Sequence, residues 1–118
     1  MDQVEAGRYV DDWIRLWNAH DIDSLLVHFA DDVVFTSPLA ARVIDGSGGV
    51  IRGRDALRTY WTTALRAVPD LHFDLVGWYL GVHTIVINFR NQKGVSANEV
   101  LIFDGSLVVQ GHGTYAVG

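Results

Sequence analysis

The stretch NEVLIFDGSLVVQGHGTY (residues 98–115) places two apolar, alternating runs on either side of Asp104-Gly105. Asp-Gly between strand-like runs is a strong signal for a two-residue hairpin turn, because both turn residues take a positive φ. Such a turn predicts a register in which Phe103 lies opposite Ser106. We therefore expect an antiparallel β-hairpin in this part of the chain.

The same register pairs Glu99 with Gln110 and Ala97 with His112. Because side chains alternate across a sheet, one face of the hairpin is expected to hold seven of them. They are Ala97, Glu99, Leu101, Phe103, Val108, Gln110 and His112. A carboxylate, an amide and an imidazole then share an otherwise apolar surface. Ionisable groups in such a setting are candidates for ligand chemistry.

Length and composition predict one globular domain, residues 1–118. Apolar residues make up 49% of the chain and charged residues 19%, which favours a packed core over disorder. The net charge is −5 and no cluster of Lys and Arg occurs, so we expect neither nucleic acid nor a membrane surface as a partner. The chain contains no cysteine, which excludes disulfides and thiolate metal sites.

No apolar run approaches the length of a membrane span, and the first five residues (MDQVE) are acidic, unlike a signal peptide. These features predict a cytoplasmic protein. The five histidines are not spaced as metal ligands on one element, so no metal site is expected.

Helical periodicity dominates the first half of the chain. An apolar stripe predicts a helix over residues 4–18, and Asp21 is the expected N-cap of a second helix that reaches Phe29. A third helix is expected between Gly53 and Pro69.

Strand signals dominate the second half. Short glycine-containing turns separate four predicted strands: 71–79, 83–90, 95–103 and 107–115. An earlier strand is expected at 33–36, ending at Ser37-Pro38, and a short hairpin between 42–44 and 50–52. Helices gathered early and strands gathered late predict an α+β fold in which the helices cover one face of the sheet.

The order of these features resembles the SnoaL-like and ketosteroid-isomerase-like families of the nuclear transport factor 2-like superfamily, over residues 8–116. The resemblance is carried by Asn18-Ala19-His20-Asp21, Phe29-Ala30-Asp31-Asp32, Ser37-Pro38 and Gly53-Arg54-Asp55. It implies a cone-shaped fold in which a curved, mixed but mainly antiparallel sheet wraps around three helices and encloses a ligand cavity. It also implies a homodimer. No cofactor is expected, because acid–base chemistry in such a cavity moves only protons.

Comparison with the steroid isomerases shows three differences at functional positions. The general base of that family, an Asp just before Pro, corresponds here to Ser37, and the oxyanion-hole Tyr of the first helix corresponds to Trp13. The protonated Asp of the fifth strand corresponds to Glu99. A serine hydroxyl does not remove a carbon-bound proton without activation, so steroid isomerisation by the familiar route is not expected.

Two other branches of the resemblance suggest different catalytic groups. Scytalone dehydratase and related lyases pair a His on the third strand with an Asp near the end of the first helix, and His72 and Asp21 stand near those positions. SnoaL-type polyketide cyclases use an acidic residue and a His in the cavity, for which Glu99 with His112 or His72 are the candidates.

The sequence therefore predicts an acid–base enzyme, such as an isomerase, cyclase or lyase, acting on a small hydrophobic carbonyl compound. The residues expected to contact this substrate are Trp13, Trp17, Phe35, Ser37, Tyr60, Trp61, Leu101 and Gln110. The alternative is a non-catalytic binding or dimerisation module that has kept the cavity and lost the base, as Ser37 suggests.

Overall fold

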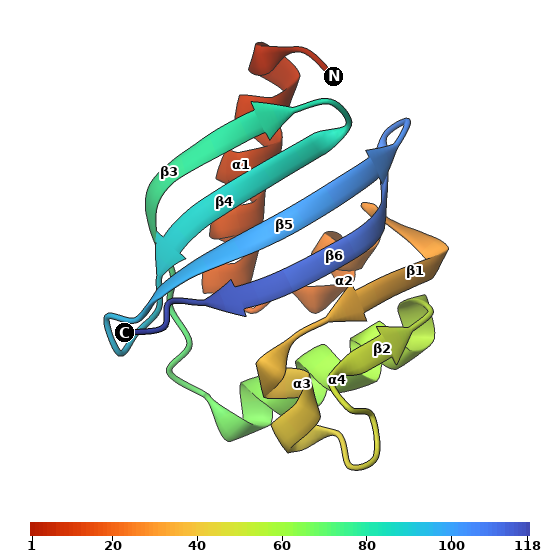
Figure 1. The fold of residues 1–118 in the computed structure, drawn as a ribbon, viewed down its shortest axis with the longest axis vertical. Coiled ribbons are helices and arrows are strands. Elements are labelled where there is room, and N and C mark those ends of the chain that lie inside the picture. The colour runs from red at the N-terminus through yellow and green to blue at the C-terminus, as the bar shows by residue number, and fades with distance from the viewer.

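The computed structural model describes all of residues 1–118, as four helices and six strands (Figure 1). The helices are α1 (Gln3–Asn18), α2 (Ile22–Leu26), α3 (Pro38–Val43) and α4 (Arg54–Ala67). The strands are β1 (Phe29–Thr36), β2 (Val50–Arg52), β3 (Asp74–Gly81), β4 (Thr84–Arg90), β5 (Ser96–Asp104) and β6 (Leu107–Tyr115).

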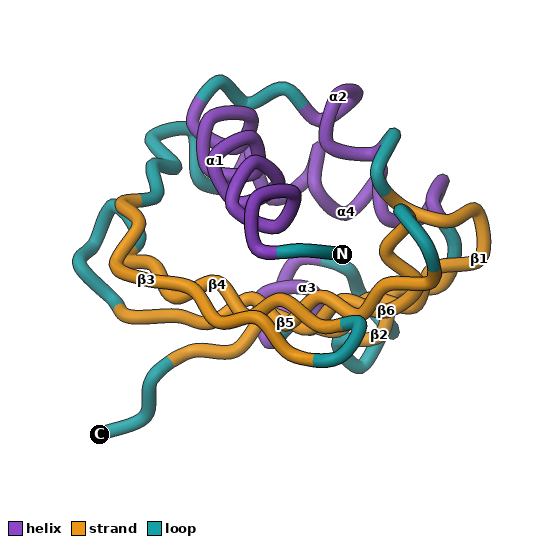
Figure 2. The backbone as a smooth tube through the Cα atoms, turned by 90° about the horizontal axis from the view of Figure 1, so that it is seen from above, coloured by secondary structure: helices purple, strands orange, loops and turns teal.

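All six strands form one curved, open sheet in the order β2-β1-β6-β5-β4-β3. β1 and β6 are parallel, whereas every other neighbouring pair is antiparallel. Helices α1, α2 and α4 lie together over one face of this sheet (Figure 2). The predicted α+β architecture with a mixed, mainly antiparallel sheet is confirmed.

The two long helices begin where the sequence predicts. The Asp2 side chain caps α1 by accepting a hydrogen bond from the Glu5 N–H at 2.8 Å, and the buried stripe of α1 includes Val10, Trp13 and Trp17. Helix α4 follows Gly53, whose φ of +89° suits a residue without Cβ. None of the helices is both long and apolar enough to cross a membrane.

The segment after β1 differs from the prediction. Residues 42–44 do not form a hairpin with 50–52; residues 38–43 form α3 instead, and β2 pairs with β1. The reason is local, because Ser37 is an N-cap residue and Pro38 suits the first helical position. The second helix is also shorter than expected, since α2 ends at Leu26 and the buried Phe29 begins β1.

The hairpin of β5 and β6 forms, but its register was predicted wrongly. The turn residues are Gly105 and Ser106, so Asp104 lies opposite Leu107. Of these two turn residues only Gly105 has a positive φ, which is typical of a type II′ turn rather than the expected type I′. The turn therefore lies one residue later than the Asp-Gly signal indicated.

A β-bulge then changes which side chains face inward. Phe103 pairs with Val108 but Ile102 pairs with Gln110, which leaves Val109 as the extra residue. The later turn moves the partner of each β5 residue by two positions and the bulge moves it by one more, so Glu99 lies opposite Gly113 rather than Gln110. The shift by two keeps a β6 side chain on its predicted face, whereas the single-residue shift at the bulge moves it to the opposite face. Glu99 faces the inner side of the sheet, but the prediction that Gln110 and His112 share that face with it is wrong.

Candidate active site

A cavity of about 430 Å³ lies between the inner face of the sheet and the helices. Helices α1 and α4 supply one wall, strands β1, β4, β5 and β6 supply the other, and the segment after α4 closes a side. Eight of the 20 lining residues are aromatic: Trp13, Trp17, Phe35, Tyr60, Trp61, Phe73, Phe89 and Tyr115. Such a lining favours a flat, apolar ligand.

These rings pack against one another as well as lining the cavity. Trp17 and Trp61 meet edge to face with ring centroids 4.9 Å apart, and the centroids of Phe73 and Phe89 lie 4.3 Å apart. The indole N–H groups of Trp13 and Trp17 are buried without a hydrogen-bond partner. Each is an unsatisfied donor in a cavity-lining residue, so a ligand acceptor that reached it would remove an energetic penalty.

Glu99 is the one carboxylate that lines the cavity. It lies on β5, its residue is only 6% exposed, and its carboxyl group makes neither a hydrogen bond nor an ion pair within the protein. Burial disfavours the charged form and raises the pKa of Glu99 to about 8. At neutral pH the group is therefore mostly protonated, and it gains or loses its proton close to physiological pH.

Hydroxyl groups from three elements gather beside this carboxyl group. The Tyr60 hydroxyl donates to Ser37 Oγ at 3.2 Å, and Ser37 Oγ also accepts from the Leu39 N–H at 3.2 Å. Having accepted two hydrogen bonds, the Ser37 hydroxyl keeps its own proton to donate. Burial raises the pKa of Tyr60 and of Tyr115, so both phenols stay protonated as donors.

Gly113 leaves the space that separates Glu99 from Ser37. A Cβ atom at this position would stand 3.3 Å from Ser37 Oγ and 3.5 Å from Glu99 Oε1. Both oxygen atoms therefore border one small volume, one from β5 and the other from the N-cap residue of α3. The arrangement can place a ligand oxygen or carbon between a titrating carboxyl group and a hydroxyl donor.

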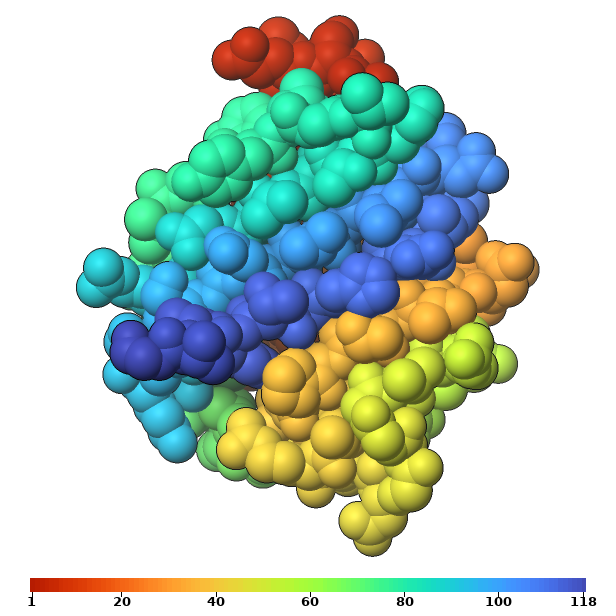
Figure 3. All heavy atoms as spheres, viewed as in Figure 1, coloured from red at the N-terminus to blue at the C-terminus, as the bar shows by residue number.

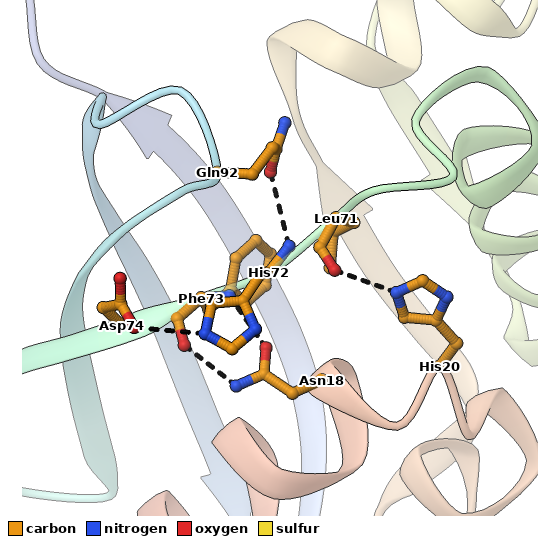
Figure 4. A network of polar contacts seen from close by, with 7 residues as sticks. All are labelled: Asn18, His20, Leu71, His72, Phe73, Asp74 and Gln92. Carbon is orange, nitrogen blue, oxygen red and sulfur yellow. Dashed lines mark hydrogen bonds and ion pairs between the residues drawn. The ribbon is translucent and has the colours of Figure 1, made fainter.

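His72 and Asp21 do not come together. His72 is exposed and its Nε2 lies 3.1 Å from Asp74 Oδ1, while the Asp21 carboxylate caps α2 by accepting from the Ser24 N–H and hydroxyl. Figure 4 shows His72 on the segment before β3, beside the end of α1. Neither side chain lines the cavity. The local helix start accounts for Asp21 without a catalytic partner.

His112 and Gln110 lie on the outer face of the sheet because of the bulge in β6. His112 Nδ1 is 2.7 Å from Thr36 Oγ1, and His112 Nε2 is 3.3 Å from Gln110 Oε1. Neither residue lines the cavity, and the fully buried Leu101 does not line it either. The other residues expected to contact substrate do line it: Trp13, Trp17, Phe35, Ser37, Tyr60 and Trp61.

Several lining residues were missed in the sequence. Phe89 and Tyr115 lie in β4 and β6, and Phe73 lies just before β3. Each is an aromatic residue in a run predicted as a strand, but the sequence did not show which face of that run is buried. Arg42 and Lys93 also line the cavity, and their exposure places them at its open end. Arg42 was assigned to a strand that does not form, so nothing in the pattern pointed to it.

No group of three or more His, Asp or Glu side chains is arranged to hold a metal ion.

Comparison with known proteins places this chain in a family. A family model described as a SnoaL-like domain matches residues 10–108. The chain belongs to the SnoaL-like domain family. A search of curated proteins found no match.

Solved structures agree with this assignment. A SnoaL-like protein of unknown function from Burkholderia thailandensis is 38% identical, with a TM-score of 0.90 over 99% of both chains. A putative polyketide cyclase from Sinorhizobium meliloti is 13% identical, with a TM-score of 0.72 over 86% of this chain and 89% of its own. TerC, co-crystallised with polyporic acid, is 11% identical, with a TM-score of 0.75 over 96% of this chain and 90% of its own. The last two show a shared fold alone.

Proposed function

We propose that this SnoaL-like domain is an acid–base enzyme in which Glu99 moves a proton on a small hydrophobic carbonyl compound. The observation that carries the proposal is the Glu99 carboxyl group, buried without a partner at the wall of an aromatic cavity. A buried ionisable group that titrates near neutral pH is suited to proton transfer. The reaction would be of the isomerase, cyclase or lyase type and calls for no cofactor.

The proposed step begins with the ionised form of Glu99. Its carboxylate takes a proton from the carbon beside the substrate carbonyl, and the electron pair of that C–H bond moves to form an enolate. The hydroxyl groups of Ser37 and Tyr115 donate to the enolate oxygen, while the Tyr60 hydroxyl keeps its hydrogen bond to Ser37 Oγ. Protonated Glu99 then returns the proton to carbon, so that proton and charge balance over the cycle.

The step predicts a pH dependence. With a pKa of about 8, roughly one tenth of Glu99 is ionised at pH 7, so a rate that needs the carboxylate rises with pH and levels off above 8. If the reaction required only the protonated form of Glu99, the rate would instead fall as the pH rises.

Two structural relatives support this substrate class. One is named as a putative polyketide cyclase and the other was crystallised with polyporic acid. Both share the fold at low identity, so they support the class of ligand rather than its identity.

Deuterium exchange of 2-tetralone in heavy water, followed by proton NMR, tests the proposal. We expect the wild-type protein to exchange the protons beside the carbonyl faster than buffer, and Glu99→Gln to lower that rate roughly a hundredfold or more. His112→Asn, on the outer face, is the matched control and should leave the rate unchanged. Equal rates for wild type and Glu99→Gln would contradict the proposal.

The second candidate is a binding module without catalysis. It is favoured by Ser37 at the position of the isomerase base and by the lack of a second carboxylate or imidazole in the cavity lining. No exchange by the wild-type protein, together with unchanged ligand binding by Glu99→Gln, would support this candidate.

A further inference from the structure

Two positively charged side chains stand at the open end of the cavity. Arg42 comes from α3 and Lys93 from the loop between β4 and β5, so distant parts of the chain bring them to one site. Both residues are exposed, whereas Glu99 and Trp61 deeper in the cavity are buried. The cavity therefore changes from apolar inside to cationic at its mouth.

Neither charge is neutralised within the protein. The four ion pairs of the structure involve Arg15, Arg54, Arg58 and His72. The guanidinium group of Arg42 and the ammonium group of Lys93 make no hydrogen bond. The chain as a whole carries a net charge of −5, so the two unpaired positive charges at the cavity mouth are opposite in sign to the net charge of the protein.

The charge of Arg42 also reaches the hydroxyl groups of the site. Burial raises the pKa of Tyr60 and of Tyr115, and the positive charge of Arg42 acts in the opposite direction on both. Arg42 and these two phenols line the same cavity.

We propose that the substrate is an apolar ring compound that carries a carboxylate group, which Arg42 and Lys93 bind at the mouth while the ring enters the aromatic cavity. Guanidinium groups bind carboxylates through paired hydrogen bonds, and an ammonium group adds a further charge. The opposite orientation would bury the ligand carboxylate in the apolar part of the cavity, and whenever Glu99 is ionised for the proposed step, two negative charges would repel each other. The inference rests on the proposed function for the reacting end of the substrate, but recognition at the mouth can be measured separately.

Binding of 2-naphthoate and 2-naphthamide, followed by quenching of tryptophan fluorescence at pH 7, tests the proposal without any turnover. The two probes share a ring and differ in charge. We expect the wild-type protein to bind naphthoate roughly tenfold more tightly than naphthamide. This ratio of affinities should shrink when the salt concentration rises from about 0.05 M to about 0.5 M. Arg42→Gln and Lys93→Gln should each weaken naphthoate binding and leave naphthamide binding unchanged.

Arg8→Gln is the matched control, because Arg8 is exposed on α1 and does not line the cavity. It removes the same charge and should not alter the preference. Equal affinity for the two probes, a loss in Arg8→Gln as large as in Arg42→Gln, or no binding of either probe would overturn the proposal. Exchange of neutral 2-tetralone that depends on Glu99 would still support the proposed function in those cases, so the two failures are distinguishable.

Discussion

The burial of a single carboxyl group, that of Glu99, makes the stability of the whole protein depend on pH. Its pKa is about 8 in the folded protein and about 4.5 for an ordinary glutamate, so the folded state holds a proton that the unfolded state releases between these values. The free energy of unfolding therefore falls as the pH rises from about 4.5 to about 8, by up to a few kcal/mol.

This linkage predicts the stability of Glu99→Gln. The neutral amide has no charge to bury, so the variant should gain in melting temperature relative to wild type as the pH rises, and the difference should level off above pH 8. Thermal unfolding followed by circular dichroism from pH 4.5 to 9 measures it. A difference that stays constant over this range would show that Glu99 does not titrate as the structure indicates.

Two glycines of β6 allow a matched pair of substitutions. A Cβ at Gly111 would stand 2.7 Å from Phe35 Cδ2, whereas one at Gly113 would meet nothing closer than 3.3 Å. We expect Gly111→Ala to lower the free energy of unfolding by roughly 1–3 kcal/mol through overpacking. Gly113→Ala should change stability by less than about 1 kcal/mol but slow the exchange of 2-tetralone, because its methyl group enters the space between Ser37 and Glu99.

Urea unfolding and the exchange assay, run on both variants, separate these effects. Equal stability losses, or full exchange activity in Gly113→Ala, would contradict the geometry described for this strand.

At the scale of elements, the connection between α4 and β3 is held to the end of α1. The Asn18 side chain donates to the Phe73 carbonyl at 2.9 Å and accepts from the Phe73 N–H at 2.8 Å (Figure 4). His20 Nε2 also lies 2.9 Å from the Leu71 carbonyl oxygen. These contacts position Phe73, whose ring stacks on Trp13 in the cavity wall.

Substitution of Asn18 should therefore loosen this segment. We expect Asn18→Ala to lower the free energy of unfolding by roughly 1–3 kcal/mol, because both backbone groups of Phe73 lose their partner. Asn18→Asp keeps an acceptor for the Phe73 N–H and should lose less. Hydrogen exchange of the Phe73 amide, measured by NMR, should speed up most in Asn18→Ala, and unchanged protection would argue against this role.

The elements also show how far the sequence can predict this structure. Helices α1 and α4 and strands β3 to β6 were predictable because their apolar periodicity and caps are local signals. The bulge at Val109 has no such signal, and it alone moves His112 and Gln110 to the outer face. The alternation of β5 places Glu99 among buried apolar residues, and its catalytic role stays a prediction. The hydroxyl groups beside it come from Ser37, Tyr60 and Tyr115, whose contacts with one another no local pattern reveals.

On the scale of the whole molecule, the outer face of the sheet is the side not covered by α1, α2 and α4 (Figures 2 and 3). Half-buried aliphatic residues Val86, Val100 and Ile102 lie on it beside Tyr79, which is 66% exposed. The homodimer expected from the sequence stays a prediction, and this is the surface where we expect it. Burial of this surface between two copies of the chain would stabilise the dimer through the hydrophobic effect.

Light scattering during size-exclusion chromatography measures the oligomeric state. We expect a dimer for wild type and a monomer for Val100→Lys, which places an ammonium group at the centre of that face. Val4→Lys, exposed on α1, is the control for the added charge. A monomeric wild-type protein, or a dimer unaffected by Val100→Lys, would contradict the expectation.

The proposed chemistry depends on Glu99 holding its proton to an unusually high pH inside the cavity. A titration of the protein labelled with carbon-13 at glutamate side-chain carboxyl carbons, with Glu99→Gln to assign the signal, measures this directly. We predict that the Glu99 resonance titrates with a midpoint near pH 8. A midpoint for Glu99 near 4.5 would show a solvated carboxylate and would contradict the proposed chemistry.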